Sequence, residues 1–300
     1  MDLNQEIIRI DNLELLAKQV VEGFITGLHK SPYHGFSVEF AEHRQYNAGE
    51  SIRNIDWKLF ARTERLYVKR FEEETNLRCQ ILLDVSSSMY YPKTGVNKLR
   101  FSVVGAASVM NMLKRQRDAV GLTVFNNQIE DHIPAKSSAS HHQLLMKTLH
   151  DADNRNADQK ETDVISTLHE IAERINRRSM VVIFSDMFDS GDEAALFDAL
   201  QHLKFNKHEV ILFHTMHHQS ELNFDFENRP YTFEDIETGE RVKLFPSEVK
   251  QHYTAELNRF YTNLRNKCAQ YKIDFVECDV SKPIDQILLP FMVKRQRMRG

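Results

Sequence analysis

The segment LRCQILLDVSSSMYY, residues 77–91, joins an apolar run to an acidic residue and three serines. The apolar run is rich in aliphatic side chains, which is typical of a strand buried on both faces. Asp84 comes where that strand ends, and Ser86 and Ser88 follow at alternate positions. An Asp-x-Ser-x-Ser sequence at a strand end can bind a metal ion, present a nucleophile or form a turn. The rest of the chain has to decide between these three roles.

Apolar strands and amphipathic helices alternate along most of the chain. The helical segments carry apolar residues at spacings of three and four, whereas the strand segments are short and rich in β-branched residues. This alternation predicts an α/β fold, a doubly wound and mostly parallel sheet of the Rossmann type with helices on both faces. The predicted strands are residues 77–85, 119–125, 180–186, 208–216 and 273–280, and the predicted helices lie around residues 99–113, 141–150, 164–175, 193–203 and 247–271.

Two segments stand outside this alternation. Residues 1–76 combine a helical pattern with short alternating strands, and they are predicted to form a small N-terminal α+β extension. Residues 77–300 form the α/β domain, in which a hairpin near residues 229–246 is an insertion that turns at Thr238-Gly239. Trp57, the single tryptophan, is expected to anchor a core.

The composition excludes several classes of protein. The formal net charge of -4 gives no electrostatic basis for binding nucleic acid. Three widely spaced cysteines suggest neither a disulfide framework nor a zinc site. Neither a signal peptide nor an apolar stretch of roughly 18 residues is present, so a cytoplasmic protein with no membrane span is expected.

Oxygen-bearing side chains lie in three predicted loops that reach the same edge of the sheet. The carboxyl ends of parallel strands form that edge, where open α/β sheets bind ligands. Hydroxyl and carboxylate oxygens suit Mg²⁺ or Mn²⁺ and disfavour zinc or copper. A lysine ammonium in the pocket, or a large distance from Asp84 to Thr162 or Asp186, would exclude the predicted metal site. The predicted ligands are Asp84, Ser86, Ser88, Thr162 and Asp186.

The same three-part pattern resembles the metal-ion-dependent adhesion site of von Willebrand factor A-type domains. That resemblance implies a doubly wound α/β fold and a Mg²⁺ ion that accepts a carboxylate from a protein ligand. The chain further resembles a bacterial family called domain of unknown function 58. The matching features are Arg44-x-Tyr46, Gly49-Glu50, the Arg53 to Trp57 segment, Ala61-Arg62 and, late in the chain, FEDIETGE from Phe233 to Glu240.

Two departures from the family pattern concern the site. Gly49-Glu50-Ser51 stands where the family usually has Gly-Asp-Asp. Lys160 and Glu161 stand where glycines usually precede the threonine, and such a charged pair can block the open metal position or add a ligand. Ligand exchange at the metal is the property that this second departure affects.

The resemblance implies a metal-dependent protein-interaction module that acts with a MoxR-type AAA+ ATPase in the assembly or activation of a complex. Two alternatives stay open, a metal-dependent hydrolase and a scaffold with a vestigial site. The sequence argues against an enzyme, because it lacks a Gly-x-Ser-x-Gly elbow, a P-loop and a histidine placed by motif as a general base. No catalytic residue is therefore assigned.

Overall fold

The computed structural model of this chain describes residues 12–22, 37–45, 55, 57–74, 77–155, 164–188, 192–234 and 239–288. It divides into two units, residues 1–29 together with 78–300, and residues 30–77. Within the described part of the chain, no helix has both the length and the apolar character needed to cross a membrane.

The larger unit contains a six-stranded sheet in the order β10-β7-β6-β3-β4-β5. Every neighbouring pair is parallel except β4 and β5, which are antiparallel. The predicted doubly wound, mostly parallel sheet is therefore confirmed. The strands are β3 (Arg78–Asp84), β4 (Ala119–Phe125), β5 (Ile129–Lys136), β6 (Met180–Ser185), β7 (Glu209–Met216) and β10 (Asp274–Asp279).

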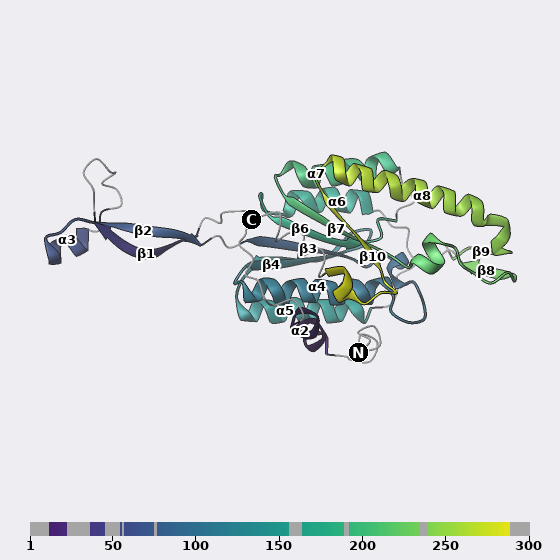
Figure 1. Ribbon diagram of the computed structural model, residues 1–300, viewed down its shortest axis with the longest axis horizontal. Coiled ribbons are helices and arrows are strands. Elements are labelled where there is room, and N and C mark those ends of the chain that lie inside the picture. The colour runs from purple at the N-terminus through teal and green to yellow at the C-terminus, as the bar shows by residue number, and fades with distance from the viewer. Residues whose placement is uncertain are drawn as a thin grey trace. The chain divides into compact units, whose positions relative to one another are not determined.

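Helices cover both faces of this sheet (Figure 1). One face carries α4 (Lys98–Arg115), with α5 (Ala139–Asp153) and α2 (Leu13–Glu22) packed against it. The opposite face carries α6 (Val164–Arg174), α7 (Glu193–Phe205) and the long α8 (Pro246–Gln270). The fully buried strands between these layers explain why the sequence shows continuous apolar runs there.

The position of α2 corrects the predicted division at residue 76. The helix buries Leu13, Leu16, Ala17 and Val20, and it packs on α4 of the larger unit. The smaller unit is therefore residues 30–77 rather than 1–76. Apolar spacing located the helix correctly, but a helical pattern alone does not say which neighbour covers its apolar face.

The smaller unit pairs β1 (Ser37–Gln45) with β2 (Tyr67–Glu74) in antiparallel register, with an irregularity between Phe40 and Glu42. Its helix α3 (Trp57–Thr63) buries none of its residues. Trp57 is 57% exposed and meets only Phe60, edge to face, among the ring contacts of the described residues. The expectation that Trp57 anchors a core is wrong, because its side chain is largely exposed and no residue of α3 is buried.

The predicted hairpin is present as β8 (Tyr231–Glu234) and β9 (Arg241–Leu244), which pair in antiparallel register. Gly239 adopts a φ of +74°, as a turn residue does. The turn itself includes residues 235–238, which lie outside the described part of the chain. An aromatic cluster joins this insertion to α8 through the Phe224 and Tyr253 rings, whose centroids are 4.6 Å apart.

Strand β5 was not predicted. Its sequence IEDHIPAK contains a proline and a mixture of charged and apolar residues, and the structure places it at the edge of the sheet. Proline is tolerated there because one side of an edge strand needs no ladder hydrogen bond. The edge position explains why the pattern of a buried strand is missing.

Gly121 sets how closely β4 and β5 approach. The register of this pair shifts between Val120 and Leu122. A Cβ atom at Gly121 would lie 2.2 Å from Gln80 Oε1 and 2.6 Å from the carbonyl oxygen of Ile133. The backbone of β5 cannot move away without losing its pairing with β4.

We expect Gly121→Ala to destabilise the protein by about 2–4 kcal/mol, since the added methyl group overlaps backbone as well as side-chain atoms. The free energy of unfolding in urea measures this. The control is Lys136→Ala on the exposed end of β5, which should change that energy by less than about 0.5 kcal/mol. Equal stability of Gly121→Ala and the wild type would show that β5 is not held as described.

Candidate metal centre

Asp84 is the last residue of β3, in the middle of the sheet, and it is completely buried. The amide of Val85 donates to the carbonyl of Phe125 over 2.8 Å, so pairing with β4 continues one residue past the strand. The chain then bends, and the amide of Ser86 donates to Asp84 Oδ1 over 2.9 Å. This side-chain turn directs the serines back over the end of β3.

The serines begin a short 3-10 helix, Ser87–Tyr90. The Oγ atoms of Ser86 and Ser88 lie 3.1 Å apart. Ser87 lies between them in sequence and is buried. The two hydroxyl groups therefore contact each other, and the Ser86 hydroxyl also hydrogen-bonds to Asp84.

Asp186 follows β6, the neighbour of β3 in the sheet. Ser185 Oγ donates to Asp84 Oδ2 over 2.5 Å, which joins the ends of the two strands. A hydrogen bond from the Ser88 hydroxyl helps to lower the pKa of Asp186. The structure thus brings Asp84, both predicted serines and Asp186 together. Thr162, with Lys160 and Glu161, lies outside the described residues.

The Asp84 carboxylate lacks full electrostatic compensation. Burial raises its pKa, the nearby negative charge of Asp186 raises it further, and the result is a pKa of about 6. Hydrogen bonds from Ser185 and Ser86 oppose this shift. Among the described residues, no basic side chain lies within ion-pair distance of Asp84.

Asp186, in contrast, has a cationic partner. Lys98, the first residue of α4, places Nζ 2.7 Å from Asp186 Oδ2 and 2.6 Å from Glu221 Oε1. Only 2% of the Lys98 side chain is exposed. Burial favours the neutral forms, but the ion pair overcomes it: the pKa of Asp186 is held below and that of Lys98 above its usual value.

Glu221 belongs to a short π-helix, His218–Leu222, that follows β7. Its Oε2 accepts a hydrogen bond from the amide of His217 over 2.7 Å. Tyr91 reaches the same turn from the serine loop and donates its hydroxyl to Ser220 Oγ over 2.6 Å. The serine loop, α4 and the connection toward the hairpin are therefore tied together at the site.

Sequence reasoning did not find Lys98 or Glu221. A lysine at the start of a helix usually remains in solvent, and no pattern in the sequence distinguishes this one. The only signal was Asn97, whose side chain accepts from the amide of Arg100 as an N-cap. Such a cap locates the helix start beside the strand end, but it does not show that the next side chain points inward.

The residues present fit a hard divalent cation in two respects. The donors brought together are carboxylate and hydroxyl oxygens, the set that Mg²⁺ and Mn²⁺ prefer. The three carboxylates of Asp84, Asp186 and Glu221 face a single ammonium, Lys98, so negative charge is in excess. The described residues contain no group of three or more His, Cys, Asp or Glu arranged for a metal. Hydroxyl oxygens and water would therefore complete any coordination here.

Lys98 argues against a metal ion, because a lysine ammonium in the pocket was the arrangement expected to exclude a metal. It contacts Asp186 and Glu221 rather than Asp84. Asp186 Oδ1 also accepts from the amide of Phe188 over 3.1 Å. Each carboxylate oxygen has two lone pairs, so the contacts present leave capacity for a further ligand.

Comparison with curated proteins finds relatives that match part of this chain. The uncharacterized proteins Rv1480 of Mycobacterium tuberculosis (strain H37Rv) and Mb1516 of Mycobacterium bovis are each 25% identical over 174 residues, which is 58% of this chain. The chain spans 55% of the length of these curated relatives.

Solved structures superpose on it only in part. An aerotolerance-related membrane protein of Bacteroides fragilis NCTC 9343 gives a TM-score of 0.45 at 14% identity, over 70% of this chain and 95% of that one. BatB of Bacteroides thetaiotaomicron gives 0.43 at 13% identity, over 74% and 99%. The VWA domain of SpRpn10 gives 0.32 at 12% identity, over 46% and 75%. The doubly wound architecture itself follows from the strand order of this chain.

A family model described as "Protein of unknown function DUF58" matches residues 42–261. The match includes the serine loop, Lys98, Asp186 and Glu221, and it extends over most of the chain. This chain therefore belongs to the DUF58 family, as its motifs predicted.

Proposed function

We propose that this chain is a protein-interaction module that holds Mg²⁺ or Mn²⁺ at the carboxyl edge of β3 and β6. The residues that would hold the ion are Asp84, Ser86, Ser88 and Asp186, with Thr162 as the fifth predicted ligand. A bound divalent ion supplies the positive charge to which a carboxylate of a partner protein binds. The observation that carries the proposal is the buried Asp84 carboxylate, which lies beside a second carboxylate and forms no ion pair with any described residue.

The proposal is one of binding rather than catalysis. The Ser86 and Ser88 hydroxyls contact each other, and no histidine of the described part of the chain lies within hydrogen-bond distance of either. Lys98 keeps Asp186 ionised, which makes that carboxylate a weak base at neutral pH. Among the described residues, neither a histidine nor Asp186 therefore offers these hydroxyls an oriented base.

We propose a MoxR-type AAA+ ATPase as the partner, which is what the family resemblance implies. The site suits such a role because its charged groups connect several segments. Lys98 links the start of α4 to Glu221, and Tyr91 links the serine loop to Ser220. Occupation of the site would therefore affect the surface around it as well as the ligands themselves.

Metal binding is tested by thermal unfolding with and without Mg²⁺. Saturating Mg²⁺, about 100 times its Kd, should stabilise the wild type by about 2.7 kcal/mol and raise Tm by about 5 °C or more. Asp84→Asn should lose this shift. Without metal it should be at least as stable as the wild type, since it removes a buried charge.

The control for this experiment is Asp151→Asn, which changes an exposed aspartate on α5 and should keep the full Mg²⁺ shift. Equal Mg²⁺ shifts in the wild type and in Asp84→Asn would remove Asp84 from the proposed ligand set.

The role of Lys98 is tested by Lys98→Met. This change leaves Asp186 buried beside Asp84 with no ammonium, so we expect a loss of about 3–5 kcal/mol in metal-free buffer. Saturating Mg²⁺ should recover more stability in this variant than it adds to the wild type, because the ion would then be the main counter-charge. Urea unfolding measures both quantities.

Lys93→Met is the matched control, since Lys93 is 81% exposed and forms a single long contact with Glu234. It should change stability by less than about 0.5 kcal/mol. If Mg²⁺ does not restore stability to Lys98→Met, the site carries no divalent ion next to Asp186.

The partner is tested by biolayer interferometry with a MoxR-type ATPase from the same genome. We expect binding in Mg²⁺ to weaken at least about tenfold in Asp84→Asn and to be unchanged in Asp151→Asn, a difference of about 1.4 kcal/mol or more. Equal binding by both variants would show that the ATPase contacts another surface or is not the partner.

A further inference from the structure

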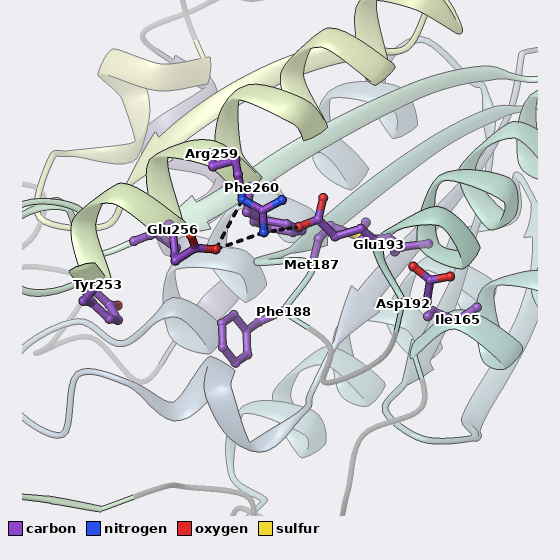
Figure 2. Close-up of a pocket in the computed structure, with 11 residues that line it drawn as sticks. Ile165, Met187, Phe188, Asp192, Glu193, Tyr253, Glu256, Arg259 and Phe260 are labelled. Carbon is purple, nitrogen blue, oxygen red and sulfur yellow. Dashed lines mark hydrogen bonds and ion pairs between the residues drawn. The ribbon is translucent and has the colours of Figure 1, made fainter. Parts of the chain in front are cut away.

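A cavity of about 280 Å³ lies under α8, and Met187 and Phe188, which directly follow Asp186 in the sequence, help to line it (Figure 2). Its walls come from three helices, α6, α7 and α8, and from the segment that follows β6. Most of its surface is apolar, which is unusual for a surface that faces solvent and typical of a ligand site. The apolar lining consists of Ile165, Met187, Phe188, Leu196, Leu257 and Phe260.

A second, separate space next to this cavity contacts charged groups. This smaller space of about 40 Å³ is lined by Lys98, Asp186 and Glu221. It shares four residues with the larger cavity, and among them Phe188 also donates its amide to Asp186 Oδ1 over 3.1 Å. Phe188 therefore connects the lining of the apolar cavity directly to Asp186.

The two ends of this space differ in their charged groups. At the outer end Arg259 is shared between Glu193 and Glu256, at 3.4 and 3.0 Å, and Asp192 adds a further carboxylate (Figure 2). The rim thus carries more negative than positive groups, and it disfavours a phosphate or a second carboxylate. At the inner end, Asp186 and Glu221 already share the Lys98 ammonium, so it is the proposed metal ion that would favour a carboxylate there.

The size of the cavity and the exposure of Phe188 indicate which kind of group can occupy it. A volume of about 280 Å³ is at the lower end of the roughly 300–1,000 Å³ of small-molecule sites, and it can accept one or two side chains. Phe188 is 55% exposed although it is a large apolar residue. A bulky apolar side chain that enters the cavity would cover it and gain apolar contact area.

We propose that this cavity selects the partner: it takes a bulky apolar side chain that neighbours the metal-bound carboxylate in a segment of the partner protein. The inference rests on the proposed function, because the metal site fixes the carboxylate. The preferred ligand is therefore an aspartate or glutamate next to leucine, phenylalanine or a similar residue, with no further acidic group beyond it.

Fluorescent peptides test this proposal. Each carries one central aspartate whose two neighbours are leucine, phenylalanine, serine or glutamate, and binding is followed by anisotropy in saturating Mg²⁺. Peptides with leucine or phenylalanine should bind at least about tenfold more tightly than those with serine, and those with glutamate should bind weakest.

Phe188→Ser and Leu257→Asn should each reduce this preference to less than about threefold while binding of the serine peptide is kept, since threefold is only about 0.6 kcal/mol. The matched control is Phe205→Ser, which alters a phenylalanine that is 83% exposed at the end of α7 and outside the cavity lining. It should keep the full preference.

The outcomes separate this proposal from the one on which it rests. Mg²⁺-dependent binding with no preference among neighbours would overturn the apolar subsite and leave the metal site supported. Leucine peptides that bind equally without Mg²⁺ or to Asp84→Asn would overturn the link between carboxylate and metal. Tighter binding of a free fatty acid than of any peptide would overturn the choice of a protein segment, and no binding by any peptide would contradict both proposals.

Discussion

Two buried carboxylates at the end of adjacent parallel strands determine the organisation of this site. Burying a charge is unfavourable unless it is paired or hydrogen-bonded. Asp186 meets this requirement through Lys98 at 2.7 Å, whereas Asp84 has only hydrogen bonds from Ser185 and Ser86. The raised pKa of Asp84, about 6, shows that these hydrogen bonds do not fully offset burial and the charge of Asp186.

The same charges join segments that lie far apart in sequence. Lys98 begins α4 and Glu221 lies in the turn after β7, yet one ammonium binds both Glu221 and Asp186. Tyr91 and Ser220 form a second link between the serine loop and that turn. Because Asp186 and Glu221 share one counter-charge, a change in charge at either carboxylate alters the hold of Lys98 on the other.

The sequence predicted the parts of this site that depend on strand topology. Asp84 and Asp186 each follow an apolar run, and the carboxyl ends of parallel strands meet at one edge, so their proximity could be inferred without coordinates. The directions in which side chains point could not be inferred from strand topology. Neither Lys98 at a helix start nor Glu221 in an irregular turn belongs to a periodic pattern, so their inward orientation follows only from the packing around them.

In the fold as well, features that depend on a sequence pattern were predicted, whereas features that depend on neighbouring elements were not. Every strand predicted from a continuous apolar run is present in the sheet, because burial on both faces requires such a run. The edge strand β5 needs no such run, and it was not predicted because its sequence contains a proline. Trp57 was misjudged for a related reason. A large aromatic residue usually lies in a core, but the seven-residue α3 has no buried side of its own.

Lys98 and a divalent ion are compatible because they neutralise different charges. The ammonium contacts Asp186 and Glu221, and Glu221 is partly solvated, with 23% of its side chain exposed. The carboxylate that remains without a counter-charge is Asp84, whose pKa is raised to about 6 by burial and by the charge of Asp186. A proton or a cation can neutralise it, and the two neighbouring hydroxyl oxygens, 3.1 Å apart, can ligate a metal ion but gain little from a proton on Asp84. The position of the serines therefore fits the proposed metal ion, and Lys98 would hold the second carboxylate in place beside it.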